Sequence, residues 1–248
     1  NVMECVRLSN FVKSVVIVTS DKCYESNFSS KGFKETDILG GVDPYSASKS
    51  STEIMVRAYR ESFFKRTNRI AVSTGRAGNV IGGGDWSPKR LIPDCIKSLR
   101  QNKTIFIRNP KFNRPWQLVL EPLKGYLMLA LKQYREPLKY SGAWNFGPNE
   151  TANKNVLDIA SAICEYWPNA PEINIVTDGK MQKEAKILAV DAKKALKKLN
   201  WEPQLSINET IKWTADWYRA FIKGDSSANL IVDEQIKNYL NRFNSSNE

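Results

Sequence analysis

A polar cluster and a Tyr/Lys pair in the first fifty residues of the 248-residue sequence carry side chains suited to acid–base chemistry. The cluster, Ser20-Asp21-Lys22, places a hydroxyl, a carboxylate and an ammonium group in succession. Tyr45 and Lys49 are four positions apart, which on a helix puts them on one face, one turn from each other. A tyrosine hydroxyl ordinarily has a pKa of ~10, and a nearby lysine favours its phenolate form. These types and spacings indicate proton transfer in one pocket.

The elements expected around both groups belong to an α/β fold. Residues 15–19 form a short, apolar, β-branched run without alternation, which predicts a buried parallel strand. The carboxyl end of that strand would deliver the polar cluster to the edge at which open α/β sheets bind ligands. Asp43 can cap a helix and Pro44 suits its first turn, so we expect a helix from about residue 44 to 66.

Predicted strands and helices alternate along the rest of the chain. Apolar spacing predicts strands near residues 70–74, 104–107, 144–146 and 173–177, and helices near 91–99, 121–134, 156–167 and 207–221. In the helix at 44–66, apolar residues at helical spacing are expected to face the core: Ile54, Met55, Ala58, Tyr59 and Phe63. Four tryptophans are expected in the core: Trp144, Trp201, Trp213 and Trp217. Trp116 fits packing and ligand contact equally well.

Composition narrows the class of protein. The chain is 42% hydrophobic and 25% charged, typical of a globular protein, and no run reaches the ~18 apolar residues that span a bilayer. Its four scattered cysteines suggest neither a zinc site nor a disulfide framework, so no metal is expected and a cytoplasmic location is the simplest interpretation. A histidine-based hydrolase triad is excluded because the chain has no histidine. The net charge of +11 admits an anionic ligand.

Three runs resemble the extended, nucleotide-sugar branch of the short-chain dehydrogenase/reductase family. They are Thr-Ser-Asp-Lys-Cys-Tyr at 19–24, Asp-Pro-Tyr-Ser-Ala-Ser-Lys at 43–49, and Arg-Ala-Gly-Asn-Val-Ile-Gly-Gly-Gly-Asp-Trp at 76–86. Shorter matches follow as far as about residue 221. The resemblance implies an α/β fold: a partial Rossmann-like, doubly wound parallel sheet whose N-terminal strands are missing, with a smaller α/β substrate-binding subdomain. We expect residues 1–82 to form the remaining part of the Rossmann-like domain, residues 83–223 to form mainly the substrate-binding subdomain, and residues 224–248 to form a polar tail.

The resemblance also implies a reaction, the dehydration of a nucleotide sugar through an internal NAD-dependent redox cycle. Tyr45 would take the proton of the sugar 4-hydroxyl, and Ser20 would bond the 4-oxygen. Asp21 would protonate the departing 6-hydroxyl as a general acid, which requires a poorly solvated carboxyl group. Lys22 is the candidate base for the carbon 5 proton, although it could equally orient a water or a hydroxyl. Related dehydratases carry Asp-Glu at 21–22, so the Asp-Lys pair points to CDP-glucose.

Ligand contacts follow from the same resemblance. The cofactor contacts it implies are Thr19, Tyr45, Lys49 and Arg76. The substrate contacts it implies are Ser20, Asn79, Lys89, Arg90, Leu91 and Arg114. A guanidinium in this set could bind the diphosphate bidentately. A homodimer pairing through the helix that holds Tyr45 is also expected.

The sequence departs from the family in one respect. The Gly-rich turn and helix that hold the NAD pyrophosphate in this family are absent, and the glycines at 82–84 do not replace them. The chain is therefore expected to be the carboxyl-terminal part of a dehydratase, with its activity alone left open. The strand at 15–19 would then be an apolar sheet edge prone to aggregation.

Three alternatives remain open. Another extended-family enzyme, an epimerase or a dTDP-sugar dehydratase, is the first, although an epimerase needs no acid such as Asp21 for carbon 6. A truncated pseudoenzyme is the second. A basic nucleic-acid-binding module is the third, and the absence of a recognised motif or clustered basic stripe argues against it.

Overall fold

The computed structural model describes residues 1–25, 32–65, 69–148, 153–176 and 189–245. The chain forms two compact units that interleave along the sequence. The first comprises Asn1–Gly78, Pro122–Gly147 and Leu188–Glu202, and the second comprises Asn79–Glu121, Pro148–Ile187 and Pro203–Glu248. The linear division expected from the sequence differs from these units, because residues 122–147 and 188–202 return to the first.

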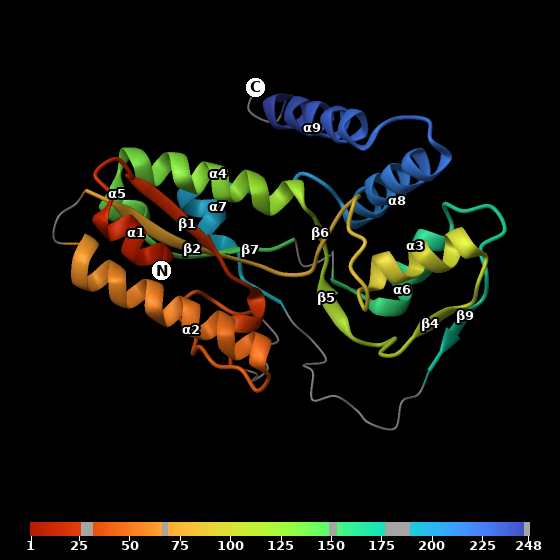
Figure 1. The fold of residues 1–248 in the computed structure, drawn as a ribbon, viewed down its shortest axis with the longest axis horizontal. Helices are drawn as coiled ribbons and strands as arrows, with labels where there is room; N and C mark the ends of the chain where they lie inside the picture. Colours follow the sequence, from red (N-terminus) through yellow and green to blue (C-terminus); the bar gives the residue numbers. More distant parts are fainter. Residues whose placement is uncertain (26–31, 66–68, 149–152, 177–188, 246–248) are drawn as a thin grey trace. The chain divides into compact units, whose positions relative to one another are not determined.

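The first unit is built on a parallel sheet of three strands, β1 (Ser14–Val18), β2 (Ala71–Ala77) and β7 (Gly142–Phe146), in the order β1-β2-β7 (Figure 1). The runs at 15–19 and 70–74 form parallel strands, as predicted, but the burial predicted for the first is wrong: β1 is only partly buried and Val18 is 51% exposed. β2, the central strand, is buried along its whole length. All three carboxyl ends point to one edge of the sheet, so side chains that follow β1 and β2 come together there.

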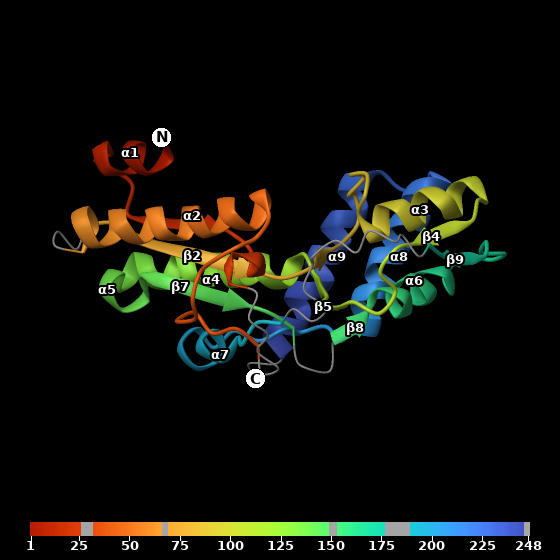
Figure 2. The ribbon, with the colours of Figure 1, turned by 90° about the horizontal axis from the view of Figure 1, so that it is seen from below.

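Helices cover both faces of this sheet (Figure 2). α1 (Val2–Leu8) and α2 (Pro44–Tyr59), which continues into a π-helical turn at Arg60–Phe64, lie on one face. α4 (Leu120–Arg135), α5 (Pro137–Tyr140) and α7 (Lys193–Leu199) lie on the other. Alternation along the strands explains this, since Val15 and Ile17 pack toward α2 while Val16 packs toward α4 and α7.

The apolar stripe predicted for α2 is wrong except at Tyr59, which packs against the core around Val56 and Val72. Ile54, Met55 and Phe63 are 48%, 55% and 46% exposed, and Ala58 is exposed as well. The helix instead buries Ser46, Ser50, Glu53 and Val56. The apolar residues do recur at helical spacing, but the face of α2 that packs on the sheet is the neighbouring face, whose amino-terminal half is polar.

The second unit contains three two-stranded sheets. They pair β3 (Val80–Ile81) with β6 (Gln117–Leu118), β4 (Ile105–Ile107) with β9 (Ile173–Ile175), and β5 (Asn113–Pro115) with β8 (Asn153–Asn155). Its helices are α3 (Leu91–Gln101), α6 (Val156–Cys164), α8 (Ile207–Lys223) and α9 (Ala228–Ser245). The polar tail expected after residue 224 thus forms a long helix.

The tryptophans predicted in the core are confirmed there. Trp144, Trp201 and Trp217 are buried, and Trp213 is partly buried against Leu118 and Tyr239. Trp116 is buried too, and its indole N–H donates to the carbonyl oxygen of Lys154, which favours packing for this residue. Among the described helices, none is long and apolar enough to cross a membrane.

Candidate active site

The chain turns sharply where β1 ends, and this turn holds the polar cluster. Ser20 caps the short 3-10 helix η1 (Asp21–Cys23) by accepting the backbone N–H of Lys22 at 3.2 Å. The Ser20 hydroxyl donates to Asp21 Oδ1 at 3.1 Å. Ser20 and Asp21 are buried, and Lys22 is half-buried. The cap therefore fixes a hydroxyl and a carboxyl group side by side at the sheet edge.

The start of α2 is fixed by the capping residue that the sequence indicates. The Asp43 carboxylate accepts the backbone N–H groups of Tyr45 and Ser46, both at 3.0 Å, and the Ser46 hydroxyl at 2.6 Å. The hydrogen bonds from Ser46 lead the contributions that lower the pKa of Asp43, and the charge of Lys22 is a smaller one. Asp43 thus remains a charged cap at neutral pH, favourable at a helix amino end.

Glycine is required at residue 41 for close approach. Its φ is 156°, and a Cβ at this position would lie 2.6 Å from the backbone nitrogen of Ala47. The loop before α2 therefore packs directly on the first turn of the helix.

Tyr45 and Lys49 lie one turn apart at the start of α2, with Tyr45 exposed and Lys49 half-buried. Lys49 Nζ is 5.7 Å from the centroid of the Tyr45 ring, and Tyr45 is 51% exposed. The helical spacing predicted for the pair is confirmed. η1 packs against α2, so the turn with Ser20, Asp21 and Lys22 and the helix with Tyr45 and Lys49 belong to one local assembly within the first unit.

A carboxylate that the sequence did not single out joins these two segments. Glu53 is 4% exposed and accepts the Thr19 hydroxyl at 2.5 Å, directly before Ser20. It also accepts the Thr74 hydroxyl at 2.7 Å. Glu53 lies one turn after Lys49, and this spacing was the only signal in the sequence that could have pointed to it.

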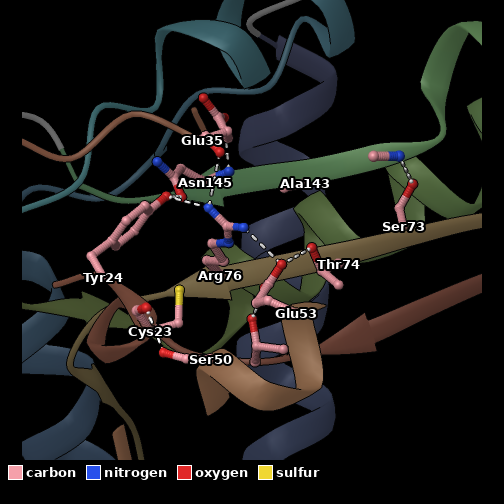
Figure 3. Close-up of polar contacts among 12 residues, drawn as sticks. Cys23, Tyr24, Glu35, Ser50, Glu53, Ser73, Thr74, Arg76, Ala143 and Asn145 are labelled. Carbon is pink, nitrogen blue, oxygen red and sulfur yellow. Dashed lines mark hydrogen bonds and ion pairs between the residues drawn. The ribbon is translucent and has the colours of Figure 1, made fainter. Parts of the chain in front are cut away.

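Arg76 neutralises Glu53 inside the protein (Figure 3). Its NH2 group donates to Glu53 Oε2 at 2.7 Å, and both side chains are 3% exposed. Burial alone would raise the pKa of Glu53 and lower that of Arg76. The ion pair outweighs burial in both groups, so the pKa of Glu53 is lowered and that of Arg76 is raised. Both remain charged.

Further polar contacts hold Arg76 from the other side (Figure 3). Its NH1 group donates to the Tyr24 hydroxyl at 2.7 Å, and that hydroxyl donates to Asn145 Oδ1 at 2.6 Å. Burial raises the pKa of Tyr24, which keeps the phenol neutral and able to donate. Burial likewise raises the pKa of the Cys23 thiol to about 12, so this cysteine is a packing residue and not a nucleophile.

The other expected substrate contacts lie in the second unit. Asn79 is half-buried, and its carbonyl oxygen accepts the backbone N–H of Gln117. Lys89 is exposed in a left-handed conformation, with φ at 65°. Arg90 is exposed, and its guanidinium meets Asp85 at 3.1 Å. Leu91, half-buried, begins α3.

Arg114 is the buried member of that set. It is 4% exposed, donates to the carbonyl oxygen of Asn113 at 2.8 Å, and lies over the Phe112 ring. The structure thus groups Ser20, Asp21, Lys22, Tyr45 and Lys49 in the first unit and places the expected diphosphate contacts in the second.

Sequence comparisons identify relatives of this chain. A family model described as GDP-mannose 4,6 dehydratase matches residues 1–214. A CDP-glucose 4,6-dehydratase from Salmonella typhimurium is 38% identical over 245 residues, which cover 97% of this chain and 67% of the relative. A dTDP-glucose 4,6-dehydratase from Xanthomonas campestris is 27% identical over 212 residues, covering 81% of this chain and 56% of the relative.

Solved structures agree on the fold. A dTDP-glucose 4,6-dehydratase from Bacillus anthracis, in complex with NAD, matches with a TM-score of 0.73 at 23% identity, covering 88% of this chain and 65% of that one. A UDP-glucuronic acid 4-epimerase from Bacillus cereus matches with a TM-score of 0.74 at 19% identity and the same coverage. This chain thus spans about two thirds of the length of several relatives. The expected Rossmann-like α/β fold is confirmed, and the chain belongs to the GDP-mannose 4,6-dehydratase family of nucleotide-sugar enzymes.

Proposed function

We propose that this chain carries the catalytic residues of an NAD-dependent dehydratase that converts CDP-glucose to CDP-4-keto-6-deoxyglucose. The observation that supports the proposal is the local assembly of the Ser20-Asp21-Lys22 turn with the Tyr45/Lys49 pair at one sheet edge. The similarity of this chain to a CDP-glucose 4,6-dehydratase supports the choice of CDP as the nucleotide. In this proposal NAD, when bound, accepts a hydride from the sugar and later returns it.

Tyr45 and Lys49 remove the first proton. Tyr45, as its phenolate, takes the proton of the sugar 4-hydroxyl, and the Lys49 ammonium one turn away stabilises that phenolate. Both side chains are open to a ligand, since Tyr45 is 51% exposed and Lys49 is half-buried. Lys49 also holds the nicotinamide ribose.

The turn after β1 performs the elimination of water. The Ser20 hydroxyl bonds the 4-oxygen, and the Asp21 carboxyl group donates a proton to the departing 6-hydroxyl. Burial of Asp21, which is 3% exposed, supports this role because a poorly solvated carboxyl group holds its proton more readily. Lys22 removes the carbon 5 proton, or it orients the group that does.

Two of the cofactor contacts take a different place in this proposal. Thr19 and Arg76 are 7% and 2% exposed, and both side chains bond Glu53. We therefore propose that Thr19 and Arg76 position other residues of the site through Glu53, and that they do not contact NAD directly as the resemblance implies. Tyr45 and Lys49 remain the residues of this chain that would hold NAD.

The nucleotide diphosphate is the proposed ligand of the basic residues in the second unit. Lys89 and Arg90 are exposed and can reach phosphate oxygens, and the Arg90 guanidinium can bind them bidentately. Asn79 and Leu91 are proposed to contact the nucleotide through backbone or side chain. Arg114 is buried over Phe112, so it would support this surface from behind.

Turnover of CDP-glucose with added NAD tests the proposal. We would assay this chain and, in parallel, the full product of the gene that encodes it, and detect a product lighter by one water. UDP-glucose and dTDP-glucose serve as matched substrates. Dehydration of CDP-glucose in either protein supports the proposal, and preference for another nucleotide corrects the base. An epimerised product of unchanged mass would mean an epimerase, and no turnover by either folded protein would favour a pseudoenzyme.

We also propose that the protein pairs as a homodimer through α2. Ile54, Met55 and Phe63 leave exposed apolar side chains on α2 and the turn that follows it, and exposed apolar surface that gathers in one region can mark a protein–protein interface. Light scattering should then give twice the monomer mass. A Met55→Lys variant should shift the protein toward monomer, and an unchanged mass would place the interface elsewhere.

A further inference from the structure

The amino-terminal half of α2 rests on polar groups instead of an apolar core. Ser46, Ser50 and Glu53 are 6%, 5% and 4% exposed and recur at i, i+4 and i+7 on the buried face. Apolar contact on this face begins only at Val56, which packs with the core around Val72. The half of the helix that carries Tyr45 and Lys49 is therefore held by directional hydrogen bonds.

These bonds reach the polar turn from two sides. The Ser50 hydroxyl donates to the carbonyl oxygen of Cys23 at 2.7 Å, at the end of η1. Glu53 accepts the hydroxyl of Thr19 at 2.5 Å, directly before Ser20. The turn with Ser20, Asp21 and Lys22 is thus tied to α2 at both of its ends.

We propose that Glu53, with Arg76 as its counterion, is a positioning residue that sets the geometry between the Tyr45/Lys49 pair and the Ser20-Asp21-Lys22 turn. This inference rests on the proposed function for its catalytic meaning, and on contacts for its geometry. Tyr45, Lys49 and Glu53 form one row along α2, four residues apart. Hydrogen bonds that hold Glu53 near the carboxyl ends of β1 and β2 therefore also fix the position of Tyr45 and Lys49 along the axis of α2.

A charged group suits this task better than an apolar one. Apolar packing tolerates small shifts of a helix, whereas Glu53 accepts bonds from three donors: Thr19, directly after β1, and Thr74 and Arg76 on β2. Arg76 is itself fixed by Tyr24, whose hydroxyl is bonded to Asn145 on β7. All three strands of the sheet therefore contribute to the position of one carboxylate. Such a buried pair is weak evidence for added stability, which makes a specific geometric role the better explanation.

The counterion also matters for charge. A carboxylate one turn from Lys49 would compete with Tyr45 for the lysine's positive charge. Because the Arg76 guanidinium lies 2.7 Å from the Glu53 carboxylate, it compensates the negative charge of Glu53 directly. Lys49 is then left to act on Tyr45, whose ring centroid is 5.7 Å from Nζ.

The test compares Glu53→Gln with Glu136→Gln. Glu136 belongs to an exposed ion pair with Lys139 in the same unit, so the control makes the same chemical change without touching the network. Thr74→Val serves as a milder variant, because it removes one donor to Glu53 and keeps the ion pair. The variants are made both in this chain and in the full gene product.

Two readouts separate positioning from mere folding. In amide hydrogen exchange, Glu53→Gln should speed exchange at least about tenfold at residues 20–23 and 45–49, with smaller changes at 124–134 of α4. In turnover, kcat should fall about 10- to 100-fold with KM within threefold, because small misplacement slows chemistry more than binding. The isotope effect with substrate deuterated at carbon 4 should rise. Thr74→Val should shift the same readouts less.

Exchange decides the inference even when neither wild-type protein turns over substrate, an outcome that would count against the proposed function alone. Uniform faster exchange throughout the first unit would overturn the inference, since it would mark Glu53 as a general stabiliser. Unchanged exchange at residues 20–23 and 45–49 would overturn it as well. If the wild type is active, the inference is also overturned when Glu53→Gln has the same kcat and the same isotope effect as the control Glu136→Gln.

Discussion

Lys194 donates its ammonium N–H to the carbonyl oxygen of Ala143 at 2.5 Å, on the side of β7 that faces away from β2. Two residues further along the same edge, the backbone N–H of Asn145 is accepted by the Glu35 carboxylate at 3.0 Å (Figure 3). Charged side chains from α7 and from the loop before α2 thus occupy backbone groups of an edge strand. Occupied groups cannot pair with a strand of another molecule.

The position of Lys194 leads to a prediction about pH. Burial lowers the pKa of Lys194 from 10.5 to about 8, although Glu35 opposes the shift. Between pH 8 and 10.5 the unfolded chain keeps the lysine proton and the folded chain has released it, so folding gains stability as pH rises. The free energy of unfolding of wild type relative to Lys194→Met should rise by ~1–2 kcal/mol over this range, a figure reduced for partial exposure. Urea unfolding at several pH values measures it, and a constant difference would contradict the shift.

Among the described residues, no charged side chain covers the opposite edge of the sheet in this way. Thr19 donates its backbone N–H to Gly75, so the odd-numbered residues of β1 face β2 and the N–H groups of Val16 and Val18 point outward. Among the described strands, β2 alone pairs with β1. The aggregation-prone edge predicted from the sequence is therefore an edge in the structure.

Substituting Val18 should reduce self-association of this chain. Its side chain is 51% exposed, so lysine fits there without loss of core and adds charge to the open edge. Val18→Lys should lower light scattering at high protein concentration and leave the thermal midpoint within a few degrees. Leu230→Lys, at a helical position in the second unit that is 63% exposed, serves as the control. Equal improvement by both variants would mean that charge alone, and not the edge, governs association.

The catalytic role proposed for Tyr45 can be tested against a tyrosine in a similar environment. Tyr45 is 51% exposed with Lys49 Nζ 5.7 Å from its ring centroid, and Tyr134 on α4 is 54% exposed with Lys13 Nζ at 5.7 Å. Tyr45→Phe should lower kcat by about 10²- to 10⁴-fold, the usual range for loss of acid–base catalysis. Tyr134→Phe should leave kcat unchanged, and both variants should unfold at nearly the wild-type denaturant concentration. Similar losses in both would remove Tyr45 from the chemistry.

The sequence predicts well the segments that carry the proposed catalytic residues, because their signals are local. A β-branched apolar run gives β1, and the Asp43-Pro44 pair gives the start of α2. The helical spacing of Tyr45 and Lys49 then follows from the helix itself. None of these predictions depends on a distant part of the chain.

Glu53 was not predicted because its environment is not local. A glutamate in a helix is ordinarily solvated, and this one is buried because Arg76 on β2 pairs with it while Thr19 and Thr74 donate hydrogen bonds to it. The same cause explains the wrong stripe of Ile54 and Met55, since spacing shows that apolar residues share a face but not which face meets the sheet. The interleaving of the two units is equally hidden, because it depends on where residues 122–147 return.

Gly83 gives a prediction for the second unit. The glycines at 82–84 fit either a flexible turn or a ligand loop by sequence, but the structure packs the indole of Trp217 on Gly83, where a Cβ would lie 2.0 Å from Trp217 Cγ. Trp217 is 3% exposed and stacks on Phe221, so it has little room to move. Gly83→Ala should therefore cost ~2–3 kcal/mol, as overpacked cores do. Gly224→Ala, where φ is 75° and no atom lies within 4 Å, should cost only ~1 kcal/mol. Urea unfolding followed by tryptophan fluorescence compares the two, and equal costs would show that the indole relaxes.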